Sequence, residues 1–281
     1  MQLLNLYRFI AAAHLTYAVD AVPDAFSQCG GVMLVAPPEQ MKTTVVKCLS
    51  GYGDCLVLSD LNVRQLAKYL RDEISRGTYH TLALTAFEKL YKRDADTAAN
   101  IEASLSAMME EGFGHASFED SRAFVRTAKC LVVGALVESA YRQSYSSWVE
   151  SGFARRFLWV HFRLKDQMLL TRAIVNWEPI QISNGNGLPS LPFGNSIPWT
   201  TTKEELIDIW GLIKDQPGHS TPHILCAKVM SVLKWYFRHS ESPANEAWAV
   251  FRDVSKSFRM REGALVEVEV MEDKPVVSRK R

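Results

Sequence analysis

The chain has 281 residues, with 32 Lys and Arg against 31 Asp and Glu and a hydrophobic share of 47%. These values are typical of a globular protein and exclude a disordered chain. The formal net charge of +1 gives no overall electrostatic reason to expect nucleic acid, although it is compatible with a local basic face. The length predicts one large domain or two modest ones.

The cysteines and the apolar stretches bear on the compartment. Five cysteines are scattered along the chain without a C-x-x-C pair, which disfavours a zinc site and favours a reducing, cytoplasmic setting. The most apolar amino-terminal stretch, residues 9–19, is much shorter than the roughly 20 residues that span a bilayer. It is also interrupted by His14. We therefore expect a buried helix there and no membrane contact.

The order of the apolar runs predicts the fold class. Five short runs without alternation are typical of strands buried on both faces of a parallel sheet. Helical patterns separate them, and a further helix precedes them over residues 3–22. We predict an α/β protein with a parallel five-stranded sheet and flanking helices, in which the first strand lies between the fourth and the fifth. The strands are expected at residues 32–35, 56–58, 82–84, 131–133 and 158–160, and helices at 63–74 and 97–111.

The composition changes after residue 177. Residues 184–199 are rich in Gly, Asn and Pro and predict a long loop. Thr202 and Glu205 form a capping-box pattern that begins a helix, and two more helices are expected at 222–237 and 243–258. Alternating Val and Glu at 266–270 suggest a strand of a small wing over 264–270. We predict a mostly helical carboxyl-terminal lid or winged-helix-like region. The predicted units are a helical segment at 1–28, a core at 29–175, a linker at 176–200, and a lid with a wing and a basic tail at 201–281.

One loop carries the candidate chemistry. Residues 36–43 read APPEQMKT and lie between a predicted buried strand and a helix. The phosphate-binding pattern is G-x-x-x-x-G-K-[ST], in which the lysine contacts phosphates, the hydroxyl holds Mg²⁺, and the helix start favours an anion. Lys42 and Thr43 match this pattern, so Thr43 is the predicted metal ligand. The predicted nucleotide-binding residues are Pro38, Glu39, Gln40, Met41, Lys42, Thr43 and Thr44.

The loop also departs from the pattern. Ala36 and Met41 replace both glycines, and Glu39 adds a negative charge to a loop meant for an anion. Ala36 is a mild change. Met41 is a larger one, because the second glycine allows unusual dihedral angles and a close approach to the phosphates.

With these motifs, residues 1–165 resemble the AAA+ branch of P-loop ATPases, in particular helicase-like proteins of bacteria and mobile elements. Residues 36–43 look like Walker A, 81–90 like the Walker B strand, 130–134 like the sensor strand, and 151–158 like the turn that bears an arginine finger. The resemblance implies ATP and Mg²⁺ as cofactors and a homo-oligomer that acts on DNA or a nucleoprotein. Arg155 or Arg156 would then contact the nucleotide of a neighbouring subunit.

The catalytic motifs are degenerate. The Walker B segment ends in Thr85-Ala86-Phe87-Glu88, so Ala86 stands where the metal-binding acid is expected and Glu88 is the nearest replacement. Glu88 can reach the nucleotide side only if the strand continues through it. The sensor strand offers no polar group before Glu138. We therefore predict weak or absent hydrolysis, with Glu88, Arg155 and Arg156 as the candidate catalytic residues.

Simpler interpretations stay open. The chain could be a scaffold or regulatory module that kept the fold and lost the site, or a DNA-binding accessory protein. Lys42 could be a solvated lysine and Glu88 a surface charge. Arg155 and Arg156 could pair with Glu150 or Asp166. Asp60 favours a helix cap over a metal ligand, and the aromatic residues 235–237 with Arg238 and His239 favour a core helix over a nucleic-acid surface.

Overall fold

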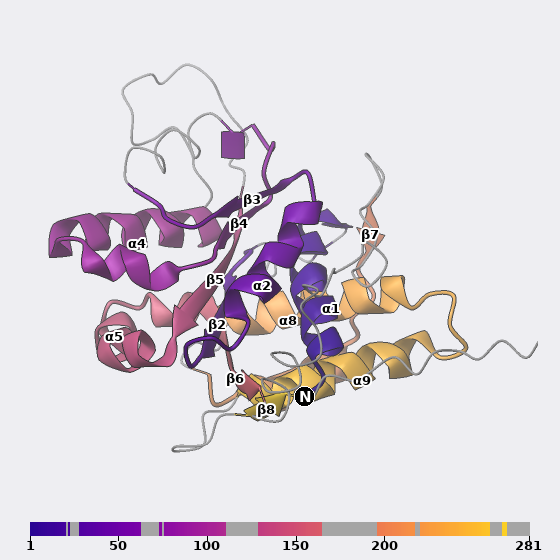
Figure 1. The fold of residues 1–281 in the computed structure, drawn as a ribbon. Helices are drawn as coiled ribbons and strands as arrows, with labels where there is room; N and C mark the ends of the chain where they lie inside the picture. The colour runs from indigo at the N-terminus through magenta and orange to yellow at the C-terminus, as the bar shows by residue number, and fades with distance from the viewer. Residues whose placement is uncertain are drawn as a thin grey trace, which may run out of the picture.

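The computed structural model describes residues 1–20, 22, 28–62, 73–74, 76–110, 129–164, 196–216, 220–258 and 266–268. Within these ranges the chain forms three layers, a parallel sheet with helices on both faces (Figure 1). Parts of the predicted helix at 63–74, the loop at 184–199 and the basic tail lie outside the described residues.

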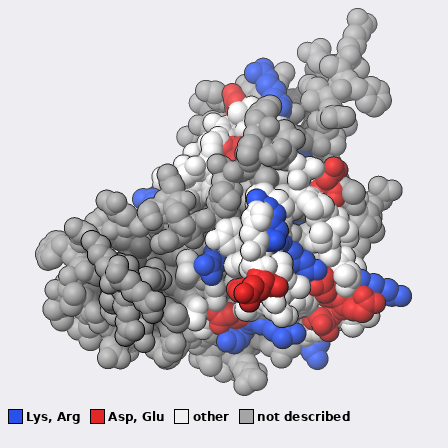
Figure 2. All heavy atoms as spheres, turned by 90° about the vertical axis from the view of Figure 1, so that its right-hand side faces the viewer, with Lys and Arg blue, Asp and Glu red and all other residues white. Residues whose placement is uncertain are grey.

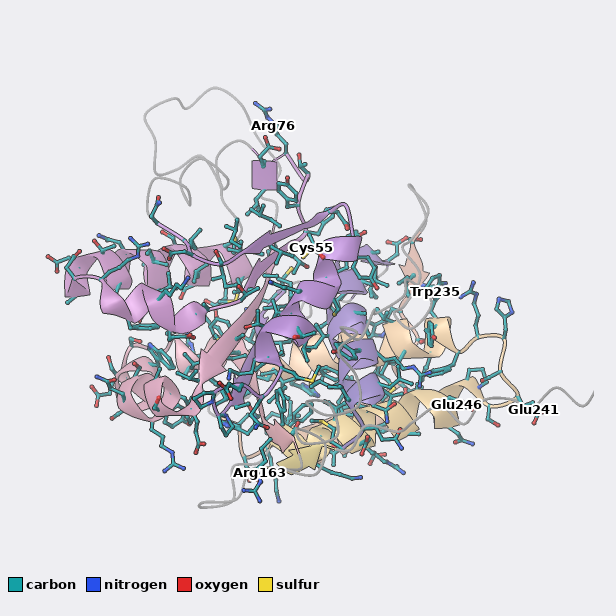
Figure 3. All side chains as sticks on the ribbon, viewed as in Figure 1. Cys55, Arg76, Arg163, Trp235, Glu241 and Glu246 are labelled. Atoms are coloured by element: carbon teal, nitrogen blue, oxygen red, sulfur yellow. The ribbon has the colours of Figure 1, made fainter. Side chains whose placement is uncertain are left out.

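The five predicted strands form one parallel sheet, which has a sixth strand that was not predicted to join it. Its strand order is β3 (Cys55–Leu58), β4 (Thr81–Leu84), β5 (Leu131–Val137), β2 (Gly31–Ala36), β6 (Phe157–Leu164) and β8 (Val266–Val268). Every neighbouring pair is parallel. The prediction that β2 lies between the fourth and fifth core strands is confirmed, since Gly31 is level with both Val132 and Phe157. Cys55 on β3 and Arg163 on β6 lie toward opposite ends of this order (Figure 3).

The prediction of a separate wing is wrong. Strand β8 pairs with β6 in the main sheet, with Phe162 level with Val266. The alternation of Val and Glu correctly indicated a strand, but alternation alone does not say which sheet a strand joins. The neighbouring residues 264–265 and 269–270 lie outside the described part of the chain.

One face of the sheet packs against helices from both ends of the sequence. Helices α1 (Leu3–His14), α2 (Lys42–Lys47), α7 (Lys203–Ile213), α8 (Ser220–Tyr236) and α9 (Pro243–Ser255) contribute to a single apolar cluster with the even-numbered residues of β2. Phe9 illustrates this packing, because its ring centroid is 5.9 Å from that of Phe251 and 5.7 Å from that of Phe258. The carboxyl-terminal helices are thus part of the same core as the first helix.

The other face packs against the middle of the chain. Helices α4 (Ala95–Glu110) and α5 (Glu138–Glu150) cover it, together with the 3-10 segments η5 (Phe87–Lys92) and η7 (Ala154–Arg156). Helix α4 buries Ala98, Ile101, Leu105, Met108 and Met109. Figure 1 shows α4 and α5 on the opposite side of the sheet from α1 and α9.

The first helix is shorter than predicted. It ends at His14 and is followed by the 3-10 segment η1 (Leu15–Ala18) and by β1 (Val19–Asp20), which pairs with β7 (Ile197–Pro198). The Thr16 hydroxyl donates a 2.7 Å hydrogen bond to the Ala13 carbonyl. Such side-chain bonds compete with the helix ladder, which accounts for an end that no Gly or Pro marks.

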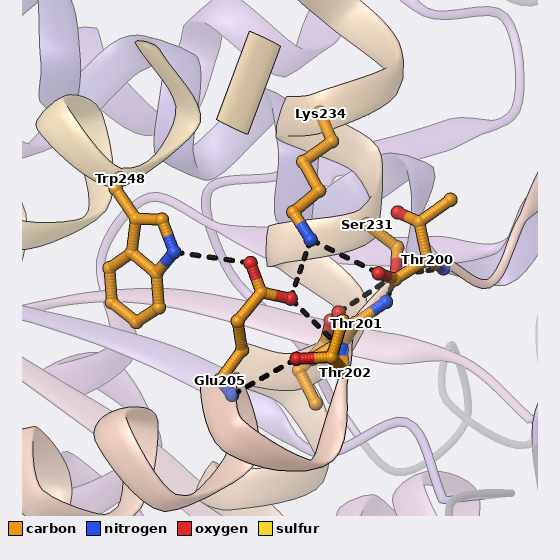
Figure 4. A network of polar contacts seen from close by, with 8 residues as sticks. Thr200, Thr201, Thr202, Glu205, Ser231, Lys234 and Trp248 are labelled. Carbon is orange, nitrogen blue, oxygen red and sulfur yellow. Dashed lines mark hydrogen bonds and ion pairs between the residues drawn. The ribbon is translucent and has the colours of Figure 1, made fainter. Parts of the chain in front are cut away.

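A polar network joins the last three helices (Figure 4). The predicted capping box is present, since the Glu205 amide donates to the Thr202 hydroxyl and the Thr202 amide donates to the Glu205 carboxylate. The same carboxylate accepts from Lys234 Nζ at 2.5 Å and from Trp248 Nε1 at 3.2 Å. One glutamate therefore connects α7 to α8 and α9. The predicted helix at 243–258 is α9 followed by the 3-10 segment η8 (Lys256–Phe258).

Candidate functional site

The loop after β2 has an unusual backbone. Strand β2 ends at Ala36 and α2 begins at Lys42, and between them Glu39 and Met41 both have φ of 61°. Left-handed dihedral angles of this kind are strained for residues with a Cβ. The loop therefore holds two non-glycine residues in a conformation that usually requires glycine. Met41 is the residue that replaces the second glycine of the pattern.

Met41 accommodates its position by packing inward. Its side chain contacts the apolar cluster on the α1 face of the sheet. Met41 is partly buried there, and this burial opposes backbone strain of about 1–2 kcal/mol. The substitution therefore preserves the loop conformation.

Lys42 is a buried lysine, and the interpretation as a solvated residue is wrong. It is 7% exposed, and its Nζ donates a 2.5 Å hydrogen bond to the Pro37 carbonyl within the loop. Burial lowers the pKa of Lys42, and the nearby Glu88 carboxylate acts in the opposite direction. The ammonium group thus lies within the curve of the loop, where an anionic ligand would find it.

Thr43 points toward the end of β4. Its hydroxyl donates a 3.3 Å hydrogen bond to the backbone carbonyl of Thr85, the first residue after that strand. The Thr85 hydroxyl in turn donates to the Leu58 carbonyl at 3.4 Å. The residue in contact with the Thr43 hydroxyl is therefore Thr85, whose side chain carries no charge. Across the described ranges, no group of three or more His, Cys, Asp or Glu side chains is placed to hold a metal ion.

Glu88 does not lie on a continued strand. Strand β4 ends at Leu84, and Glu88 lies in the first turn of η5. The condition that we set for Glu88 to face the nucleotide side is not met, yet its charge acts on Lys42. The 3-10 turn brings the carboxylate close to the loop by another route.

Strand β5 is longer than predicted and passes beside the loop. It continues through Gly134 to Val137, which is level with Ala36. Glu138 begins α5 and pairs with Arg142 at 2.5 Å. The expected sensor position thus carries an acidic residue already paired within its own helix.

The two predicted finger arginines differ. Arg156 donates to the Glu110 carboxylate at 2.8 Å and to the Gly152 carbonyl at 2.6 Å. Its acidic partner is thus Glu110 and not Glu150. Arg155 is exposed and makes no hydrogen bond or ion pair with another residue that the structure describes.

Both arginines lie at the amino ends of the parallel strands, whereas Lys42 lies at their carboxyl ends. Phe157, which follows Arg156, is level with Gly31 at the start of β2, whereas Lys42 follows the end of β2. Six strand residues span about 20 Å at 3.3 Å per residue. Neither arginine therefore completes the loop site of its own chain.

Buried histidines are the polar groups that the sequence did not reveal. His14 is fully buried and bridges the Thr81 hydroxyl at 2.8 Å and the Asp54 carboxylate at 3.1 Å. His161 on β6 is 2% exposed, and its Nδ1 has no hydrogen-bond partner among the described residues. His161 is level with Val35, near the end of the loop strand. Neither histidine belongs to a motif, so no spacing signal points to them.

Comparison with known proteins adds no assignment, because the sequence matches no protein-family model and no curated protein. Among the described helices, none is long and apolar enough to cross a membrane.

Proposed function

We propose that the chain binds ATP at the loop of residues 36–43 and hydrolyses it slowly or not at all. One observation carries this proposal: Glu39 and Met41 adopt left-handed dihedral angles and lead into a buried Lys42 at the carboxyl end of a central parallel strand. A loop that holds this strain without glycine is consistent with a retained phosphate-binding function.

The sheet topology supports the same position. In open α/β sheets, ligands bind outside the carboxyl ends of the strands, where neighbouring connections run in opposite directions. The chain leaves β2 for the far edge strand β3 and later reaches β6 on the other side of β2. The loop therefore lies at this switch point. Its backbone and Lys42 fit a polyphosphate.

The environment of Thr43 favours weak turnover. Mg²⁺ in nucleotide sites is held by phosphates, by a hydroxyl and by one or two protein carboxylates. Thr43 supplies a hydroxyl, but its neighbour is the Thr85 carbonyl. Glu88 is the nearby carboxylate, and its charge already acts on Lys42. A bound metal ion would neutralise phosphate charge. Among the described residues, few side chains of this site could orient the water that attacks the terminal phosphate.

An AAA+-like assembly fits the position of Arg155. An arginine at the opposite edge of the sheet can serve only the nucleotide of another molecule. We propose Arg155, not the paired Arg156, for that role. The DNA or nucleoprotein substrate implied by the resemblance stays a prediction, since Lys and Arg are interspersed with Asp and Glu on the face seen in Figure 2.

Thermal unfolding with and without ATP–Mg²⁺ tests the proposal. At a ligand concentration of 100 times Kd, binding stabilises the folded state by about 2.7 kcal/mol. We expect this shift for the wild type and its loss in Lys42→Ala, because the loop loses the ammonium group that faces the ligand. Lys47→Ala is the matched control, since Lys47 is an exposed lysine at the other end of α2.

An unchanged melting temperature of the wild type in saturating ATP–Mg²⁺ contradicts nucleotide binding and favours the scaffold interpretation. Brisk hydrolysis by a monomeric sample that survives Glu88→Gln contradicts the proposed weak site.

A further inference from the structure

A cavity lies near the loop, on the other face of the sheet from α2. It has a volume of about 820 Å³ and lies between α4, α5 and η5. Clefts that bind small molecules typically have volumes of about 300–1,000 Å³. The cavity reaches Val137, which is level with Ala36 at the start of the loop, and it reaches Glu88, whose charge acts on Lys42.

The two helices face the cavity with small side chains. Helix α4 contributes Ala95, Ala98 and Ala99, and α5 contributes Ala140 and Ser144. Their spacing places them on one stripe of each helix. Since these side chains are short, the helices leave room between them. The alanines of α4 suit an aliphatic stem, and Ser139, Gln143 and Ser147 make the α5 wall polar.

The charged groups of the cavity favour a cation. Glu88 and Glu102 line it, and Arg93 is the basic side chain of the lining. Arg93 is already paired through its guanidinium group with both carboxylate oxygens of Asp60, at 3.0 Å each. Two carboxylates therefore face the cavity, and the charge of Arg93 is balanced by Asp60, which does not line it.

Aromatic rings surround the deeper carboxylate. Trp148 Nε1 donates to Glu102 at 3.1 Å, and the ring centroids of Trp148 and Tyr91 are 5.0 Å apart. Burial raises the pKa of Glu102, and the hydrogen bond from Trp148 acts in the opposite direction. A carboxylate in a half-buried aromatic wall binds a cation more strongly than an exposed one.

We propose that this cavity binds a guanidinium or alkylammonium group on an aliphatic stem and that its occupation strengthens nucleotide binding at Lys42. The second part rests on the proposed function. Glu88 lines the cavity and lies three residues after Thr85, whose carbonyl accepts a 3.3 Å hydrogen bond from Thr43 of the loop, so the same carboxylate lies near the loop and would repel a bound triphosphate. A cation that pairs with Glu88 removes this repulsion. Because such coupling is reciprocal, ATP strengthens cation binding by the same factor.

Calorimetry with butylguanidinium as the probe tests the site in the absence of nucleotide. Butylurea, which has the same shape and no charge, is the ligand control. We expect butylguanidinium to bind and butylurea to bind at least tenfold more weakly. Glu102→Gln keeps an acceptor for Trp148 and removes the charge, so it should weaken binding about tenfold. Glu150→Gln, an exposed position at the end of α5 outside the cavity, should leave binding unchanged.

A second variant keeps the test decisive if Glu102→Gln unfolds. Ser144→Phe fills the space between the helices and should abolish butylguanidinium binding while the wild-type melting temperature is retained within a few degrees. Equal binding of butylurea and butylguanidinium, or binding that survives Ser144→Phe, overturns the proposal. No binding of butylguanidinium to the wild type overturns it as well.

Two further measurements separate the sources and the two proposals. A blocked tripeptide with a central arginine that binds more tightly than butylguanidinium indicates a partner's side chain, and weaker binding indicates a free small cation. Both results support the site. With butylguanidinium present, ATP affinity should rise about fivefold or more. Binding of the cation without any binding of ATP retains the cavity site and rejects both the coupling and the proposed function. Binding of ATP without any binding of butylguanidinium retains the proposed function and rejects both the cavity site and the coupling.

Discussion

His14 Nε2 lies 3.1 Å from Asp54 Oδ1, which joins the first helix to the residue before β3. The other ring nitrogen lies 2.8 Å from the Thr81 hydroxyl. The two ring nitrogens thus hold the imidazole between a carboxylate and a hydroxyl group. Tyr17 adds a hydrogen bond to the same carboxylate and stacks on His80 with ring centroids 3.9 Å apart. Two consecutive segments, α1 and η1, thus contact one carboxylate.

This relationship predicts that the free energy of unfolding depends on pH in the acidic range. Burial alone would raise the pKa of Asp54, but hydrogen bonds from His14 and Tyr17 outweigh it and leave the pKa below the ordinary 3.8. The unfolded chain therefore binds the proton more readily, so the stabilisation is present above about pH 4 and is lost as the pH falls further. Asp54→Asn should lower the free energy of unfolding at pH 7 by about 1–3 kcal/mol and flatten its decline below pH 4. Denaturant unfolding measures both, with the exposed Asp96→Asn as control.

His161 predicts a change in a different pH range. Burial lowers the pKa of His161 to about 4, from 6.5. Between these values the unfolded chain takes up a proton that the folded protein resists, so stability falls as the pH falls from 6.5 to 4. The slope is at most about 1.4 kcal/mol per pH unit. His161→Leu should reduce this slope without a large loss at pH 7, because the Nδ1 that it removes has no partner among the described residues. A variant with the wild-type slope would contradict this explanation.

Gly31 predicts a steric limit at the start of the loop strand. A Cβ at Gly31 would lie 2.6 Å from the Phe157 ring and 2.8 Å from the Val132 carbonyl oxygen. Backbone atoms on one side and a buried ring on the other cannot both move away. Gly31→Ala should therefore lower the free energy of unfolding by about 1–3 kcal/mol or more. Gly53→Ala is the control, since no atom lies within 4 Å of its added Cβ, and it should leave stability nearly unchanged.

The two arginines of η7 predict opposite phenotypes. Arg156→Ala leaves Glu110 without its partner and should cost about 1–3 kcal/mol of stability. Arg155→Ala should leave the melting temperature unchanged and lower any turnover of the assembled protein. ATP affinity should fall less in Arg155→Ala than in Lys42→Ala. Loss of stability in Arg155→Ala with none in Arg156→Ala would reverse the assignment.

Glu39 predicts a gain of function in the loop. It is exposed and has φ of 61°, so Glu39→Gly removes both backbone strain and a negative charge. We expect a gain in stability of about 0.5–1 kcal/mol and ATP affinity increased several-fold. Glu39→Gln removes only the charge and should raise affinity without the gain in stability. Equal stability of the two variants would show that the left-handed angle causes little strain.

Much of the fold could be predicted from local patterns. The five apolar runs carry their own signal, because strands buried on both faces lack polar alternation. The end of α1 could not be predicted, since Thr16 ends the ladder by a side-chain bond and not by a Gly or Pro. The partner of β8 could not be predicted either, because pairing over 100 residues apart leaves no local pattern.

The position of the loop between a buried strand and a helix was also predictable from the sequence, whereas the environment of its side chains was not. The burial of Lys42 depends on Pro37 and Glu88, which the folded chain brings together. Within the part of the chain that the structure describes, Arg156 is paired and Arg155 is not, because Glu110, which lies 46 residues from Arg156 in the sequence, accepts a hydrogen bond from Arg156. The cavity between α4 and α5 depends on two helices whose small side chains are unremarkable in either segment alone.

The parallel sheet gives the molecule two unlike poles, with the loop of residues 36–43 at the carboxyl ends of its strands and Arg155 at the amino ends. A twofold dimer joins like surfaces and would bring two loops or two arginines together. A contact between unlike poles is heterologous, so it closes into a ring or grows as a helical filament. An open filament leaves one loop at its end without an arginine, whereas a closed ring leaves none. Turnover per subunit would then rise with protein concentration and become constant once rings close.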